Sequence, residues 1–318
     1  MPIKSSYLPD GVEDITAVDA KNLESTKRAL IDFYESEGFQ LTYPSLVEFA
    51  DAIGGDENQT LKDSAFSFND DLSTKELAIR PDISQQIARI DQAEATEEER
   101  RYCYAGEVLK KRKDSFSRSR ITIKSGVEIF GGKDNRFEIL KLLSKSMEIT
   151  KIEDLTLSFG KTEVFDSFIG TCALSYKEAN ELNNIISTKS ESDLTDWVKD
   201  KEIEEEVKDK LIKLMNCKGD LSVLSDLEAL EVGKDLLKDI ESIWNFVDKE
   251  TLFEPHIDMT DFPGFNYHSG LVFSVHSKNF GFSIANGGQY KINSGATNRS
   301  AIGFDKDLFA ITKFIHNL

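Results

Sequence analysis

Cysteine and histidine are scarce in this chain, and neither is spaced as a metal site requires. The 318 residues include three cysteines, Cys103, Cys172 and Cys217, and four histidines. No Cys-x-x-Cys pair occurs, and no two histidines follow the close spacing of metal ligands. Isolated cysteines of this kind are typical of inert thiols in a reducing cytosol. We therefore expect no disulfide framework and no bound metal.

Long apolar runs are also missing. No stretch approaches the ~20 apolar residues that a membrane helix needs, and the N-terminal MPIKSSYLPDGVEDI is polar and acidic, unlike a secretory signal. We expect a cytoplasmic protein with no membrane segment. Apolar residues make up 39% of the chain and charged residues 30%, which favours a folded protein with a broad solvated surface.

Positive charge is in deficit, since the formal net charge is −18. A protein this acidic is repelled by phosphate backbones, which argues against tRNA as a partner. One basic cluster is the exception, and its tip is KRKDSFSRSR. It can hold a phosphate or the acidic surface of a partner, or it can be a solvated loop. Its candidate contact residues are Lys110, Lys111, Arg112, Arg118 and Arg120.

Apolar periodicity predicts a mixed order of elements. A helix is expected at 17–37, stopped by Gly38, followed by a strand-like run that Pro44 breaks. Ser84 is a candidate N-cap for the helix that begins with QQIARI. Further elements are a strand at 77–79, a long hairpin made by RYCYAGEVLKK and TIKSGVEIFGG, a helix at 137–150 and a strand ending at Gly160.

The segment from about 163 to 250 differs in composition from its flanks. It is poor in glycine and carries helical patterns such as EIEEEVKDKLIKLM. Beyond it, GLVFSVHS, FGFSIANGG and SAIGF predict strands, and a last helix is expected from near Asp305. We predict an α+β fold, an antiparallel sheet flanked by helices with a helical insertion. The expected division is 1–162, 163–250 and 251–318.

Polar residues that could bind a ligand fall in three places, each with an ordinary structural alternative. Asp82 and Ser84 follow a strand and could hold an ammonium group, or they could cap a helix. Glu128 lies in an apolar run, where it lines a cavity or faces solvent. The glycine-rich segments 264–270 and 285–290 let a ligand approach the backbone, or they are two β-turns.

Taken together and in order, these segments resemble a known family. YLPDGVEDI, ELAIRPDISQQIARI, the motif 2-like RYCYAGEVLKKRKDSFSRSRITIKSGVEIFG, PGFNYHSGLVF with ANGGQY, and SAIGFDKDL resemble the successive motifs of histidyl-tRNA synthetases. The second and last are closer to the synthetase paralogue of bacterial histidine biosynthesis, the regulatory subunits of ATP phosphoribosyltransferase. The resemblance covers about residues 7–160 and 251–310, and it implies the class II synthetase fold.

Departures from the synthetases suggest which activity is kept. Pro263 stands where the synthetase carries the arginine that activates the carboxylate, and no other side chain supplies a guanidinium fork. The ATP-binding segment of motif 2 has become basic, as Leu109–Lys110–Lys111–Arg112. The synthetases also continue into an anticodon-binding domain beyond the last motif, which we do not expect here.

The resemblance therefore implies a non-catalytic regulatory subunit. In that family it activates the short-form catalytic subunit and confers feedback inhibition by L-histidine, as a dimer within a hetero-octamer. ATP, phosphoribosyl pyrophosphate and Mg²⁺ belong to the catalytic partner, and this chain needs no cofactor. Alternatives are a truncated histidyl-tRNA synthetase or a synthetase-like module that binds RNA or protein. The residues matching the histidine site are Asp82, Ser84, Lys124, Glu128, Tyr267 and His268, with Lys124 where the family usually has glutamine.

Overall fold

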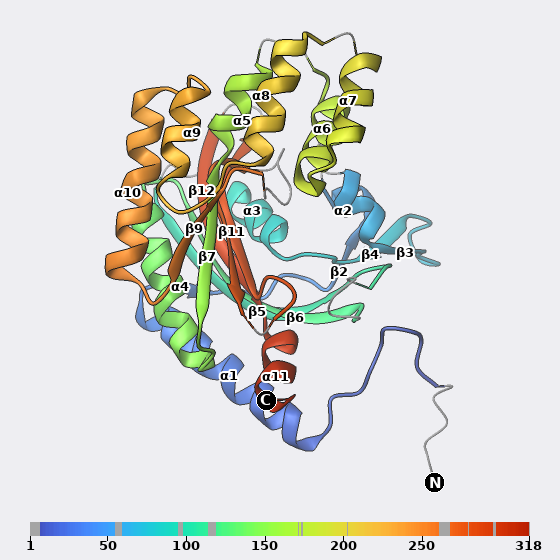
Figure 1. Ribbon diagram of the computed structural model, residues 1–318. Helices are drawn as coiled ribbons and strands as arrows, with labels where there is room; N and C mark the ends of the chain where they lie inside the picture. The colour runs from blue at the N-terminus through green and yellow to red at the C-terminus, as the bar shows by residue number, and fades with distance from the viewer. Residues whose placement is uncertain are drawn as a thin grey trace.

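A nine-stranded sheet forms the centre of the molecule, and a three-stranded sheet lies to one side of it (Figure 1). The computed structural model describes residues 7–54, 59–94, 98–113, 119–170, 172, 174–201, 203–260, 268–278, 280–294 and 297–317. The strand order of the large sheet is β1-β5-β6-β12-β11-β10-β7-β9-β8, and that of the small sheet is β2-β4-β3. Most neighbouring strands run antiparallel, as an α+β fold requires.

The N-terminal elements follow the sequence pattern closely. Helix α1, Ala17–Ser36, buries Leu23, Leu30 and Tyr34 on one face, as predicted. Gly38 follows it with φ of +90°, a left-handed conformation that stops a helix. Pro44 then separates β1, Gln40–Leu41, from β2, Val47–Phe49, and the two strands join different sheets. The predicted break at Pro44 is confirmed.

The small sheet buries one face only. Its strands are β2, β3 (Phe66–Asn69) and β4 (Glu76–Ile79), and the short helix α2 (Gln59–Ser64) precedes β3. Ala78 packs with Ile53 and Ala65 on the buried side. The register places Phe49, Leu77 and Phe68 side by side on the other face, where both phenylalanines are nearly half exposed. Part of this apolar face is thus exposed, although the Lys75 ammonium lies over the Phe49 ring at 4.6 Å from its centre.

The predicted long hairpin is the core of the large sheet. Strands β5, Arg100–Leu109, and β6, Ile121–Phe130, pair antiparallel along their whole length. After β6 come α4, Arg136–Thr150, and β7, Leu155–Lys161, again as expected.

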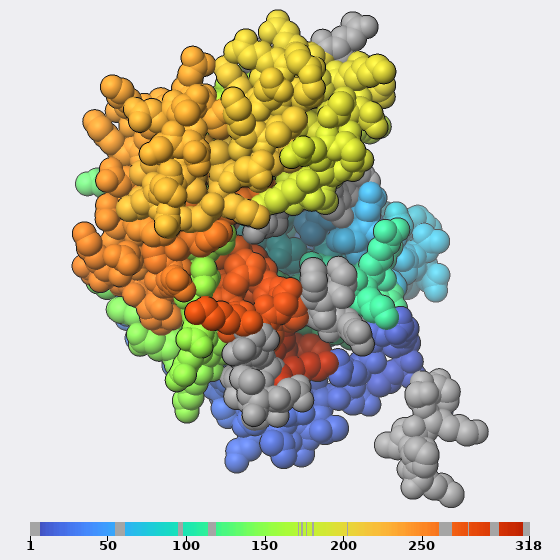
Figure 2. Space-filling view, viewed as in Figure 1, coloured from blue at the N-terminus to red at the C-terminus, as the bar shows by residue number. Residues whose placement is uncertain are grey.

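The region after β7 is almost entirely helical. It contains α5 (Thr162–Ile169), α6 (Tyr176–Thr188), α7 (Glu191–Asp200), α8 (Glu205–Met215), the two-residue strand β8 (Lys218–Gly219), α9 (Val223–Ala229) and α10 (Lys234–Glu250). In the space-filling view α6 to α10, yellow-green to orange, form one continuous mass (Figure 2). Strand β8 pairs with β9, so this region also contributes to the sheet. The proposed three-part division of the chain stays a prediction.

The C-terminal elements depart from expectation at two boundaries. The strands are β9 (Glu254–Asp258), β10 (His268–Ser277), β11 (Ala285–Ser294) and β12 (Thr297–Asp307), followed by α11 (Leu308–Asn317). The last helix begins at Leu308, three residues later than predicted, because Asp305 to Asp307 still pair with β6. The expected strand at FGFSIANGG begins only at Ala285.

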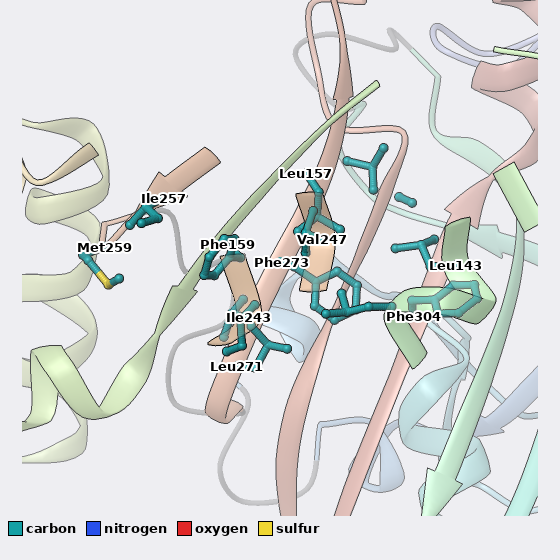
Figure 3. Packing of buried hydrophobic residues seen from close by; sticks show 14 of the residues in the cluster. Leu143, Leu157, Phe159, Ile243, Val247, Ile257, Met259, Leu271, Phe273 and Phe304 are labelled. Carbon is teal, nitrogen blue, oxygen red and sulfur yellow. The ribbon is translucent and has the colours of Figure 1, made fainter. Parts of the chain in front are cut away.

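The two faces of the large sheet are covered differently. Helices α1, α4, α10 and α11 pack on one face over a large apolar core, part of which Figure 3 shows around Phe159, Phe273 and Phe304. The other face carries helix α3, Ser84–Ala93, drawn in teal beside β11 in Figure 1. A separate apolar cluster lies beneath α3 and includes Ile87, Tyr104 and Phe130. Within the described residues, no helix is both long and apolar enough to cross a bilayer.

Candidate functional site

The candidate site lies on the sheet face that carries α3. Paired residues of antiparallel strands share a face, and the register places Tyr104, Gly126 and Asp305 in one row across β5, β6 and β12. Glu128 and Gly303 form the next row. Asp82, after the end of β4, and Ser84, at the start of α3, lie near these rows. The charge of Asp82 acts on Glu128, Asp305 acts on both, and Ser84 forms a hydrogen bond with Glu128. We call Asp82, Glu128 and Asp305 the acidic cluster.

Glu128 is buried, with only 2% of its surface exposed. The Tyr290 hydroxyl donates a hydrogen bond of 2.8 Å to Glu128 Oε2. The carboxyl lies across Gly303 on the neighbouring strand, and a Cβ at that position would overlap Oε2. The alternative that Glu128 faces solvent is therefore wrong, because the strand pairing and α3 enclose this face of the sheet.

Burial changes the protonation of Glu128. It raises the pKa of the carboxyl to about 8, and the negative charges of Asp82 and Asp305 act in the same direction. Hydrogen bonds with Ser84 and Tyr290 oppose this shift without cancelling it. Glu128 is therefore mostly protonated at pH 7, so it can donate as well as accept a hydrogen bond.

Ser84 does not cap a helix, contrary to one expectation. The N-cap position of α3 is Ile83, and no side chain there bonds to the first turn. Ser84 is the first helical residue, and its Oγ lies 3.0 Å from the Tyr104 hydroxyl. Burial and the nearby Asp305 raise the pKa of Asp82, while the cations Lys124 and Lys110 lower it. Ser84 therefore lies beside the acidic cluster, of which Asp82 is a member.

Lys124 makes an ion pair within the site. Its Nζ lies 2.5 Å from Asp305 Oδ1, and each side chain is 16% exposed. Burial opposes its charge, but the carboxylates of Asp305, Asp307 and Asp82 raise the pKa of Lys124 above its ordinary value. The sequence matching did not include Asp305 or Tyr290 among the site residues. Their alternation with Gly303 and Gly288 along β12 and β11 could have identified both as facing the same side.

Of the two glycine-rich segments, the structure describes 285–290 in full and only part of 264–270. Asn286 to Gly288 lie inside β11 and pair on both sides, so the alternative of a β-turn there is wrong. His268 begins β10, and its backbone pairs with that of Tyr290. Tyr267 and most of the first segment lie outside the described residues, so their place in the site stays a prediction.

The basic hairpin tip lies beside the small sheet. Lys110, Lys111 and Arg112 are exposed, and Lys111 N donates to Ser64 O over 2.7 Å. The Arg120 guanidinium lies 4.5 Å from the centre of the Phe66 ring. Arg118 lies outside the described residues. A partner contact and a solvated loop both remain open for these cations.

Arg80 has a structural role next to the site. It is buried, and it donates to Glu107 O over 2.7 Å and to Pro44 O over 2.9 Å. Its guanidinium lies against Gly106, where a Cβ would overlap it. These bonds tie the segment carrying Asp82 to β5 and to the β1–β2 connection.

Lys306 is a buried lysine outside the set of candidate site residues. It lies on the opposite face of the sheet, fully buried, and donates to Ser146 Oγ on α4. The Tyr34 and Phe304 rings lie 5.6 and 5.2 Å from its Nζ. Burial lowers the pKa of Lys306 well below its ordinary value. This residue contributes nothing to the site under α3.

Known proteins support the motif assignment. The histidyl-tRNA synthetase family model matches residues 11–311. A protein from Saccharophagus degradans named ATP phosphoribosyltransferase regulatory subunit is 30% identical over 96% of this chain and 80% of its own length. One of the same name from Acinetobacter baylyi is 30% identical over 98% of this chain and 83% of its own.

Solved structures share the fold. A Bacillus halodurans structure described as an ATP phosphoribosyltransferase regulatory subunit/histidyl-tRNA synthetase has a TM-score of 0.81 at 16% identity, over 98% of this chain and 84% of the other. A chain from the Thermotoga maritima ATP phosphoribosyl transferase (HisG:HisZ) complex has a TM-score of 0.66 at 17% identity, over 89% of this chain and 96% of the other. The chain belongs to the family of ATP phosphoribosyltransferase regulatory subunits, within the wider histidyl-tRNA synthetase family.

Proposed function

We propose that this chain is a regulatory subunit that has no catalysis of its own, activates a short-form ATP phosphoribosyltransferase catalytic subunit and mediates its inhibition by L-histidine. The observation that carries the proposal is the match to curated regulatory subunits over nearly the whole chain. The Thermotoga complex supports a partnership with the catalytic subunit, because its chain of the same fold is part of such an assembly. ATP, phosphoribosyl pyrophosphate and Mg²⁺ would bind to that partner.

The acidic cluster is the proposed binding site for histidine. Carboxylates of Asp82 and Asp305 suit an ammonium group, and the protonated Glu128 suits an imidazole nitrogen. Ser84 and Tyr290 orient Glu128 by hydrogen bonds. Tyr267 and His268 are proposed as further contacts from the start of β10.

Inhibition then follows from linkage. Histidine can shift the partner only if it binds the active and inhibited arrangements with different affinity, and the partner's substrates must weaken histidine binding to the same extent. Coupling of this kind typically amounts to about 1–3 kcal/mol.

Two surfaces support an assembly with other subunits. The exposed apolar face of the small sheet, with Phe49, Leu77 and Phe68, is the kind of contiguous patch that marks protein contacts. The cations Lys110, Lys111 and Arg112 border the same sheet. We propose that these surfaces serve the dimer and the contact with the catalytic subunit within a hetero-octamer.

A mixing assay tests the proposal. The catalytic subunit from the same genome is assayed alone, with this chain, and with this chain plus histidine. We expect faster turnover with the chain present and a return toward the lower rate with histidine. The charge reversals Lys111→Glu and Arg112→Glu should weaken activation, whereas Lys133→Glu, exposed in the turn after β6, serves as the matched control.

The competing functions give different results. A truncated synthetase would catalyse histidine-dependent exchange of pyrophosphate into ATP, which the missing guanidinium at Pro263 argues against. A module for RNA or another protein would leave the turnover of the catalytic subunit unchanged. Either result contradicts the regulatory role.

A further inference from the structure

The ammonium group of Lys124 lies among the carboxyl groups of the candidate site. Its ammonium lies 2.5 Å from Asp305 Oδ1, and Asp307 stands directly opposite it in the register of β6 and β12. Asp82 also acts on it through its charge. Both members of the ion pair are largely enclosed, so water screens their attraction weakly.

The remaining groups around Lys124 leave no second anion as close. Among the described residues, Asp307 Oδ1 already accepts from Ala310 N at the start of α11. Glu128 is mostly protonated at neutral pH. Asp82 is the other acid of the cluster, and Lys124 acts on it through its charge as well. The two acids that suit an incoming cation, Asp305 and Asp82, are therefore both already next to the charge of Lys124.

A lysine ammonium and the α-ammonium of an amino acid are the same kind of group, a compact cation with three N–H donors. They compete for the same carboxylate, and where two cations do share one, their mutual repulsion weakens the binding of each. Glutamine at this position would instead leave Asp305 free and supply a neutral amide.

We propose that Lys124 acts as a resident ammonium that competes with the ammonium of the ligand, so that L-histidine binds this site more weakly than it would without Lys124. The inference rests on the proposed histidine site and concerns its affinity for a ligand ammonium. Lys124 is here a specificity-determining residue, since it can also meet a ligand carboxylate when released from Asp305. The sensitivity of this chain to histidine would be lower than that of a Lys124→Gln variant.

Calorimetric titration of the full chain with three probes tests the proposal. The probes are L-histidine, histamine, which lacks the carboxylate, and 3-(imidazol-4-yl)propionate, which lacks the ammonium. Each is titrated into wild type, Lys124→Gln and the control Lys133→Gln, at about pH 7.5 where imidazole is largely neutral. A charge within a few ångströms changes the affinity for an ion by about tenfold or more.

We expect Lys124→Gln to increase the affinity only for the two probes that carry an ammonium group. Lys124→Gln should bind histidine and histamine about tenfold or more tightly than wild type does, while imidazolepropionate binds no better. The control should match wild type for all three. If Lys124→Gln does not fold, Asp305→Asn tests the same idea with opposite sign, because it removes the anion and should weaken histidine relative to imidazolepropionate.

Two other outcomes overturn the inference and can be told apart. An equal change in affinity for all three probes would mean that Lys124 does not discriminate by the ligand ammonium, and the proposed histidine site would stand. Failure of every probe to bind wild type and both site variants would contradict the histidine site itself.

Discussion

Replacing the buried Glu128 by glutamine should change how the stability of the protein depends on pH. Burial raises the pKa of this carboxyl from 4.5 to about 8, so the folded state holds a proton that the unfolded state releases. The stabilisation is fully present below about pH 4.5 and is lost as the pH rises through about 8. Glutamine keeps an acceptor for the Tyr290 hydroxyl but cannot titrate.

The size of the effect follows from the shifted pKa. Stability changes by about 1.4 kcal/mol per pH unit where only the folded state is protonated, which gives a loss of about 2.5 kcal/mol between about pH 6 and pH 9. Other groups contribute with their own signs. The raised pKa of Asp82 acts in the same direction, whereas the lowered pKa of Lys306 makes stability rise with pH. The difference between wild type and Glu128→Gln largely removes these shared contributions.

Equilibrium urea unfolding at several pH values measures the effect. The midpoints of wild type and Glu128→Gln should diverge in favour of the variant as the pH rises, with an unchanged dependence on urea concentration. Glu76→Gln, exposed at the start of β4, is the matched control and should follow wild type. Parallel curves for wild type and Glu128→Gln from about pH 6 to pH 9 would refute the assignment of a protonated buried carboxyl.

Two further substitutions test the packing around the sheet. Gly303→Ala places a Cβ against the Glu128 carboxyl and the Val127 carbonyl. It should lower the free energy of unfolding by about 1–3 kcal/mol and weaken histidine binding. The control is Gly281→Ala, whose added Cβ would have no atom within 4 Å, and it should change neither the stability nor the binding. Lys306→Met should raise the urea midpoint because it removes a buried amine. The gain should grow as the pH falls from about 10 toward 7, because the Lys306 amine of the wild type then takes up a proton more readily in the unfolded state than in the fold. A gain that is constant with pH would show that Lys306 is charged in the fold.

Local patterns were enough to predict most elements. Apolar spacing and Gly38 define α1, Pro44 separates two strands, and the alternating runs on both sides of KRKDSFSRSR form the β5–β6 hairpin. These signals depend on backbone geometry and on residues close together in the chain, so the sequence alone carries them. Collinear motifs likewise identified the family, which the comparisons confirm.

Contacts between distant segments were decided by the tertiary structure alone. The ion pair of Lys124 with Asp305 joins residues 181 positions apart, and it depends on the register of β12 against β6. The end of β12 at Asp307, beyond the expected helix start, follows from the same pairing. Ser84 turned out to face Tyr104 because α3 lies over the sheet, although its local sequence suited a cap. Charge, burial and protonation at the site are properties of that enclosure, which no single segment of sequence contains.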